Sequence, residues 1–328
     1  MSNPASPSEA AAGLTRRGLV ALSGAATLAA CARPAPSQLV LRIGYQKNGV
    51  LLVAKTTGDL ERALQHIPAS TTWSEFQSGP PLLEALNVGS VDFGGTGDTP
   101  PIFAQAAGAS LVYAASQRLR GGSGGVLTPA NSKARSVADL RGKRVAYTRG
   151  TSAHNAAAVS LERAGLSFND ITSVNLSPAD AAAAFAQGGI DAWYIWDPYF
   201  TAAREQQHAR VLETGADIGG GYSFFLANRG LAERQPALLR ATLDALAQEG
   251  RWAEAHRQDV AQIMARETGL SLPLLQDTVQ RADFAIQPMT PDVAAFQQRT
   301  ADRFLSLGIL PHRVDVAAAV WNGWTGAT

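Results

Sequence analysis

Cysteine is almost absent from this sequence. The 328 residues include a single cysteine, Cys31, so no disulfide can form within the chain. Zinc sites built from clustered cysteine and histidine are excluded as well. The five histidines show none of the close spacing that a helical metal-binding pair needs. We therefore expect no metal site and no resident cofactor.

Net charge is also nearly absent. The 28 basic and 27 acidic residues leave a formal charge of +1, which provides no long-range field for nucleic acid or an anionic membrane surface. Nucleic acid is therefore not an expected partner, and any preference for an anionic ligand must arise locally. With 46% hydrophobic and only 17% charged residues, the chain is long enough to bury the cores of two ordinary domains.

The N-terminal segment has the features of an export signal. Arg16 and Arg17 precede an uncharged stretch, residues 18–30, that is too short to span a membrane. The paired arginines favour twin-arginine translocation over an ordinary secretory leader. Residues 28–31 then resemble a bacterial lipobox, in which Cys31 becomes lipidated. The alternative is cleavage after Ala32. We thus assign residues 1–31 to an export signal with a lipobox, and expect a periplasmic protein whose membrane contact is at most this lipid anchor.

Short β-rich runs alternate with alanine- and leucine-rich helical runs through the rest of the chain, which predicts an α/β fold. Helix starts carry capping residues and first-turn prolines, and several helix ends carry glycine. Expected helices begin near residues 78, 96, 150, 177 and 197, and the chain beyond residue 231 is mainly helical. Expected strands cover residues 40–43, 111–115, 126–128, 192–196, 211–213 and 223–227.

Two glycine-rich segments interrupt this alternation, at residues 121–125 and 219–221. Their separation is about the length of one small α/β domain, so we interpret them as two hinge crossings. The expected lobes are residues 39–122 plus 220–328, and residues 123–219.

The first glycine-rich segment also matches the G-x-S-x-G pattern of a hydrolase nucleophile, with Ser123 at its centre. That motif requires a strand before it and a helix after it. Here we expect residues 117–120 not to form a strand, and a short strand to follow. We therefore expect no catalysis at Ser123.

Small polar residues lie at four points where a strand leads into a helix. Such junctions share the carboxyl edge of a sheet, where unpaired helix N–H groups can bind an oxyanion. The alternative is that these residues only cap helices, but four junctions in two lobes favour a binding site. They are Ser78 with Gly79, Thr96 to Asp98, Thr151 with Ser152, and Asp197 with Pro198.

Asp98 and Asp197 are interpreted as helix caps, because neither has a nucleophile or metal ligand beside it. Two further hypotheses are that they repel wrongly posed anions, or that Asp197 binds an amino group of a zwitterionic ligand. Trp196, the last residue before its helix, is expected to contact an apolar ligand tail. Arg118 is the preferred cation among four near the proposed loops, the others being Lys47, Arg120 and Arg149.

Several segments closely resemble the periplasmic aliphatic-sulfonate-binding proteins of ABC importers, a family related to nitrate- and taurine-binding proteins. The resemblance covers essentially the whole chain after the export signal. The segments that carry it are residues 74–80, 83–94, 96–98, 137–143, 150–155 and 191–199.

The resemblance implies a type II periplasmic binding protein fold, with two three-layer α/β domains joined by a two-crossing hinge. It also implies a monomer that is not an enzyme, and that delivers a small sulfonate to an ABC transporter permease for sulfur acquisition. The expected ligand-binding residues are Gln46, Ser78, Gly79, Thr96, Gly97, Asp98, Thr151, Ser152, His154, Trp196 and Asp197, with Arg118, Ser123 and Tyr222 as additional candidates.

The exact ligand stays open between alkanesulfonates, taurine, sulfate esters, nitrate and other small organic anions. The basic, glycine-rich segment 117–124 and Tyr222 depart from the usual family pattern. Some relatives of this fold are pyrimidine-precursor synthases that use pyridoxal phosphate and iron, but their cysteine-rich motif is absent. A neutral His154 is expected to donate one hydrogen bond to the ligand, and a protonated His154 to tighten binding at low pH.

Overall fold

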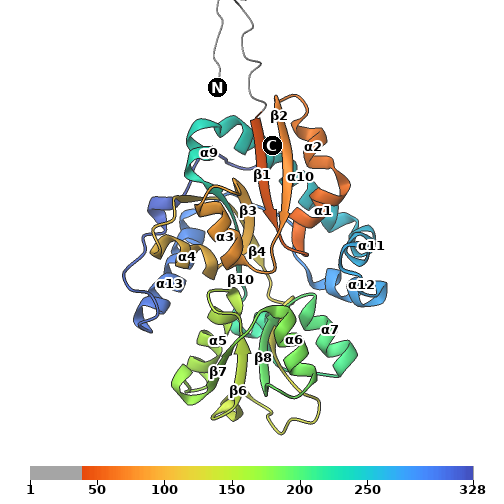
Figure 1. Ribbon diagram of the computed structural model, residues 1–328, viewed down its shortest axis with the longest axis vertical. Helices are drawn as coiled ribbons and strands as arrows, with labels where there is room; N and C mark the ends of the chain where they lie inside the picture. The colour runs from red at the N-terminus through yellow and green to blue at the C-terminus, as the bar shows by residue number, and fades with distance from the viewer. Residues whose placement is uncertain (1–38, 328) are drawn as a thin grey trace, which may run out of the picture. The chain divides into compact units, whose positions relative to one another are not determined.

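A computed structural model describes residues 39–327, so the predicted export signal with its paired arginines and Cys31 lies outside the described residues. The described chain forms two five-stranded sheets, ordered β2-β1-β3-β10-β4 and β7-β6-β8-β5-β9 (Figure 1). The first sheet contains β1 (Leu39–Tyr45), β2 (Ala69–Glu75), β3 (Phe93–Gly97), β4 (Leu111–Leu119) and β10 (Gly221–Asn228). The second contains β5 (Gly124–Thr128), β6 (Arg144–Tyr147), β7 (Thr172–Asn175), β8 (Ala192–Trp196) and β9 (Arg210–Thr214).

The two sheets have the same pattern of pairing. In the first, β1 pairs in parallel with β2 and β3, whereas β10 runs antiparallel to its neighbours β3 and β4. In the second, β6 pairs in parallel with β7 and β8, whereas β5 runs antiparallel to β8 and β9. The predicted α/β class is confirmed.

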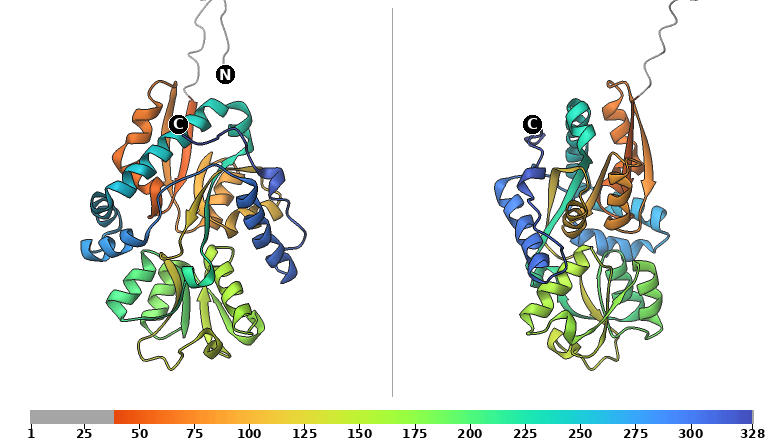
Figure 2. Two further views of the ribbon diagram at one scale, coloured as in Figure 1. Left: turned by 180° about the vertical axis from the view of Figure 1, so that it is seen from behind. Right: turned by 60° about the vertical axis from the view of Figure 1, so that its left-hand side comes forward.

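Helices cover both faces of each sheet. The first sheet packs on one face against α1 (Gly49–Thr57), α2 (Asp59–Leu64), α10 (Pro236–Ala255), α11 (Arg257–Thr268) and α12 (Leu272–Arg281). Its other face packs against α3 (Gly79–Asn87), α4 (Thr99–Ala106) and α13 (Pro291–Ser306). Figure 2 shows the C-terminal helices, in blue, beside the first sheet.

The second sheet has α5 (Ser152–Arg163) on one face, and α6 (Pro178–Ala186) and α7 (Tyr199–Gln207) on the other. Alternation along β8 places Tyr194 in the α5 core and Trp193 in the opposite core. Trp196 contacts both cores at the strand end. The remaining helices are the short α8 (Gly215–Ile218) and α9 (Arg229–Arg234).

The chain passes between the sheets twice, from β4 into β5 and from β9 through α8 into β10. The two crossings touch, because Ala216 N donates to Gly121 O at 3.0 Å. Gly121 has φ 86°, and a Cβ there would lie 2.2 Å from Ala216 N. Only glycine satisfies both constraints at this position.

One strand differs from the sequence prediction in a way that matters. β4 continues to Leu119, so residues 117–119 form a strand and not a loop. The expectation that no strand precedes Ser123 was therefore wrong. The second requirement of the nucleophile motif is still unmet, since the strand β5 follows Ser123 in place of a helix.

Two features of residues 39–327 bear on function. None of their helices is both long and apolar enough to cross a membrane. Within the same residues, no three histidine, cysteine, aspartate or glutamate side chains are grouped so that they could hold a metal ion.

Candidate ligand-binding site

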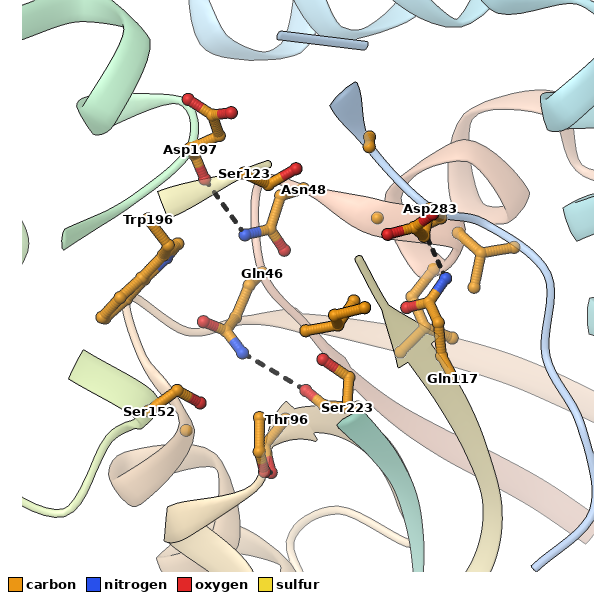
Figure 3. A pocket seen from close by; sticks show the side chains of 18 of the residues that line it. Gln46, Asn48, Thr96, Gln117, Ser123, Ser152, Trp196, Asp197, Ser223 and Asp283 are labelled. Atoms are coloured by element: carbon orange, nitrogen blue, oxygen red, sulfur yellow. Dashed lines mark hydrogen bonds between the residues drawn. The ribbon is translucent and has the colours of Figure 1, made fainter. Parts of the chain in front are cut away.

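A cavity of about 210 Å³ lies where ends of strands and starts of helices from both sheets meet (Figure 3). It collects residues from all four strand-to-helix junctions singled out in the sequence. Of the predicted ligand-binding residues, those that line it are Gln46, Gly79, Thr96, Gly97, Ser123, Thr151, Ser152, Trp196 and Asp197.

Three helices begin in the wall of this cavity: α1 at Gly49, α3 at Gly79 and α5 at Ser152. In none of them does the N-cap side chain accept a hydrogen bond from the first turn. The first N–H groups of a helix have no partner within the helix, so these donors remain available. Together with the positive ends of three helix dipoles, they form a site suited to an oxyanion.

Several other helices also start without a capping side-chain hydrogen bond, so the distinctive feature of α1, α3 and α5 is that their open starts meet at one cavity. Two helices elsewhere are capped. The Ser177 side chain accepts from Asp180 N at the start of α6, and Thr290 accepts from Val293 N at the start of α13. Neither helix start lines the cavity. In α3, Pro80 and Pro81 have no N–H group, so the open donor there is that of Gly79.

Polar side chains surround the space between these helix starts. Gln46 Nε2 donates to Gly95 O at 3.2 Å, which holds the amide at the centre of the cavity in Figure 3. Asn48 Nδ2 donates to Asp197 O at 3.4 Å and so connects the two sheets. On the other side, Gln117 Nε2 donates to Asp283 O at 2.6 Å.

Two glycines allow the walls to come together. A Cβ on Gly79 would lie 2.4 Å from Pro100 Cγ, so only glycine lets α3 start this close to α4. A Cβ on Gly97 would lie 1.8 Å from Ser152 Oγ. The end of β3 and the start of α5 are therefore in direct contact beside the cavity.

The cavity contains no positive side chain among the residues that the structure describes, and it contains two aspartates. Asp197 Oδ1 accepts from Thr201 N at 2.9 Å and from Thr201 Oγ1 at 2.5 Å. It therefore bonds to the first turn of α7, as a capping residue does, although the N-cap position itself is Pro198 and not Asp197. Burial raises the pKa of Asp197. In Figure 3 its carboxylate points away from Trp196 and Ser152, a geometry that does not favour binding of a ligand amino group.

The second aspartate, Asp283, has its carboxylate occupied by Arg120, whose backbone N donates to it at 2.8 Å and whose guanidinium forms an ion pair with it. Lys47 lies 3.4 Å from Glu75 and does not line the cavity. An oxyanion in this cavity would therefore be stabilised by helix N–H groups and neutral side chains.

Several predicted residues lie outside the cavity. Ser78 is buried at the N-cap of α3 but does not line the space, and Arg118 is exposed on β4, where it pairs with Tyr222. Tyr222 instead lines a second, adjoining cavity of about 150 Å³ and packs against Phe296 with ring centroids 5.1 Å apart.

Asp98 differs from its predicted role as a helix cap. Its side chain makes no capping hydrogen bond to α4, and it lines the adjoining cavity. Its carboxylate accepts from Thr99 Oγ1 at 2.9 Å and from Asn155 Nδ2 at 2.7 Å. It is therefore engaged across the contact between the two sheets.

His154 is likewise placed away from the cavity. Its ring stacks on Tyr147 with centroids 4.9 Å apart, and its Nδ1 accepts from Gly150 N at 3.2 Å. Burial, with a smaller contribution from the charge of Arg149, lowers the pKa of His154 from 6.5 to about 4. Contrary to the sequence expectation, a protonated His154 beside the ligand is not supported.

Sequence reasoning missed several lining residues. Asn48 and Gly49 follow β1 directly and open α1, so the strand-to-helix signal used at the other junctions could have found them. Others come from β4, β10, the C-terminal helices and the segment that follows α12, where no local pattern marks them. These are Gln117, Ser223, Met264, Thr278, Asp283 and Phe284.

Comparison with known proteins gives one consistent result. The pattern of the NMT1/THI5-like family matches residues 78–259. The chain is 41% identical over 306 residues to an aliphatic sulfonates-binding protein of Escherichia coli K12, which covers 93% of this chain and 95% of the relative.

Similar solved structures lead to the same family as the sequence comparison. The periplasmic aliphatic sulphonate binding protein SsuA from Escherichia coli has a TM-score of 0.79 and 41% identity, over 86% of this chain and 92% of that one. The alkanesulfonate-binding protein SsuA from Xanthomonas axonopodis pv. citri, bound to MOPS, has a TM-score of 0.83 and 42% identity, over 88% of this chain and 99% of that one.

Proposed function

This chain belongs to the NMT1/THI5-like family, as a relative of its periplasmic aliphatic sulfonate-binding proteins, and we propose that it captures aliphatic sulfonates for an ABC importer. Like these relatives, it is a binding protein and not an enzyme. The bound sulfonate would pass to the importer's permease and serve sulfur acquisition.

The observation that carries this proposal is the group of uncapped helix starts at Gly49, Gly79 and Ser152. A sulfonate stays ionised at physiological pH, so its capture needs fixed donors and no titrating base. Trp196 and Phe284 offer apolar surface to the organic tail of the ligand. Because no described lining residue is cationic, the wall supports a ligand held by N–H and amide donors.

We further propose that the two sheets with their helices act as lobes that close on the ligand. Residues 39–122 plus 220–328 would form one lobe and residues 123–219 the other, with bending at the glycine-rich crossings. Export to the periplasm would use the paired arginines, and Cys31 would carry a lipid. The protein is expected to act as a monomer.

A thermal unfolding screen tests the ligand. A native-state ligand at 100 times its Kd should add about 2.7 kcal/mol of stability, so we expect alkanesulfonates to raise the Tm. Taurine, sulfate esters, sulfate and nitrate complete the screen. Nitrate or an aromatic acid raising the Tm, with every sulfonate inert, would refute the sulfonate assignment.

Two variants sharpen the screen. Trp196→Ala should reduce the shift given by longer alkanesulfonates more than the shift given by methanesulfonate, because only the tail loses its contact. Trp73→Ala, in β2 and outside the cavity, is the matched control and should keep the wild-type order of ligands.

A further inference from the structure

Beside the proposed sulfonate cavity, a buried hydrogen-bonded bridge connects the two sheets. Asn155, in the first turn of α5, donates from Nδ2 to Asp98 Oδ2 at 2.7 Å. Its Oδ1 accepts from Arg303 Nη1 of α13 at 3.0 Å. Both ends of one amide are therefore used, by a carboxylate on one side and a guanidinium on the other.

The partners of Asn155 are themselves held in place. Asp98 Oδ1 accepts from Thr99 Oγ1 at 2.9 Å, and Asp98 O accepts from Gln297 Nε2 at 2.6 Å. Arg303 Nε also lies 3.9 Å from Glu162 Oε2, at the far end of α5. Asp98, at the end of the first sheet, and Arg303, on α13, are therefore held in position by other contacts when they bond to Asn155.

The bridge lies close to the oxyanion donors without being part of the cavity they line. Asp98 and Asn155 line the adjoining cavity, and neither lines the one that contains the helix starts. Asn155 is three residues beyond Ser152, whose Oγ packs against Gly97 at the end of β3. Movement of Asn155 would therefore carry the start of α5 away from Gly97 and from the donors of the other sheet.

We infer that Asn155 is a positioning residue, and that the bridge from Asp98 through Asn155 to Arg303 is a latch that sets sulfonate affinity without touching the ligand. The latch holds the α5 donors in register with those at Gly49 and Gly79. This inference rests on the proposed function. Because the latch forms only when the two sheets approach, weakening it raises the dissociation rate and leaves the encounter rate unchanged.

A charge exchange tests the latch directly, with 1-pentanesulfonate as the ligand. In Asn155→Asp a second carboxylate faces Asp98, and affinity should fall by about tenfold or more, through faster dissociation. Asp98→Asn alone should change affinity by no more than about threefold, since two amides can still bond. The double variant restores a carboxylate–amide pair and keeps a carboxylate near Arg303, so it should recover to within about threefold of wild type.

Asn175→Asp, the same change on β7 at an exposed position, is the matched control and should bind as wild type. X-ray scattering at a saturating ligand concentration for wild type should show less compaction for Asn155→Asp alone. Equal affinity of wild type and Asn155→Asp, or no recovery in the double variant, would overturn the latch. Wild type that binds no sulfonate would instead overturn the proposed function.

Discussion

At the scale of single residues, the surroundings of His154 decide its chemistry. Its ring is enclosed by Tyr147, Phe168 and Phe304, with centroid distances of 4.9, 5.3 and 4.9 Å. Removal from water is the main cause of its lowered pKa, because the imidazolium form loses its hydration. The folded protein therefore holds His154 neutral.

This lowered pKa predicts how stability depends on pH. Between pH 6.5 and about 4 the unfolded chain binds a proton at His154 that the folded chain does not. The stabilising contribution is therefore complete above pH 6.5 and is lost as the pH falls toward 4, by about 3 kcal/mol in total.

Urea unfolding at several pH values measures this contribution. The variant His154→Phe keeps the aromatic packing and should show a shallower loss of unfolding free energy than wild type across the window. His66→Phe, at an exposed position, is the control and should follow wild type. A His154→Phe profile parallel to that of wild type would show that the histidine is not held neutral.

At the scale of elements, glycine determines how closely the two crossings approach. Gly121 has φ 86° and faces the backbone of Ala216, whereas Gly142, with φ 72°, has no atom within 4 Å of an added Cβ. The two positions share the left-handed backbone and differ in the space around it. They form a matched pair for separating backbone strain from crowding.

We expect Gly142→Ala to cost about 1 kcal/mol of stability, from the left-handed conformation alone. Gly121→Ala should cost at least about 2 kcal/mol more, since the added carbon overlaps backbone that cannot rotate away. It should also weaken sulfonate binding, because the crossings that join the sheets are forced apart. Denaturant unfolding and calorimetric titration measure both effects. Similar losses in the two variants would mean that the crossings separate freely.

Element starts show where local chemistry was sufficient for prediction. The start of α3 was predicted from Ser78 with its following prolines, and β8 was predicted with its observed bounds. β2, β3, β6 and β7 were missed, because β2 and β7 are largely polar, β3 is rich in glycine and β6 has only four residues. Such strands depend on partners that are distant in sequence.

At the scale of the whole molecule, the proposed site would hold an anion without a cationic side chain among its described lining residues. In the proposed site, a fixed set of helix N–H groups from both sheets would stabilise charge through dipoles that are already oriented. Such a site has little dependence on side-chain titration. This fits a sulfonate, which keeps its charge at every physiological pH.

The export proposal also belongs to this scale, since it decides where the molecule works. We expect mass spectrometry of the protein from its native membrane fraction to find a lipid-modified Cys31 as the first residue. Cys31→Ser should release the protein into the periplasmic fraction, because each buried methylene of a lipid chain contributes about 0.8 kcal/mol of membrane affinity. An unmodified mature chain that starts at Arg33 would contradict lipidation.

The sequence by itself determined the α/β class and the strand-to-helix junctions now gathered at one cavity. It could do so because caps, first-turn prolines and parallel-strand geometry are local, and because parallel strands end at a shared edge. Only the tertiary structure decided which helix starts stay uncapped, and which C-terminal residues, such as Met264 and Phe284, complete the wall. It also places His154 in an aromatic core and Asp98 in a contact between the sheets, and not at the positions that the sequence predicted. Burial and hydrogen-bond pairing depend on residues far apart in the chain, and no local pattern records them.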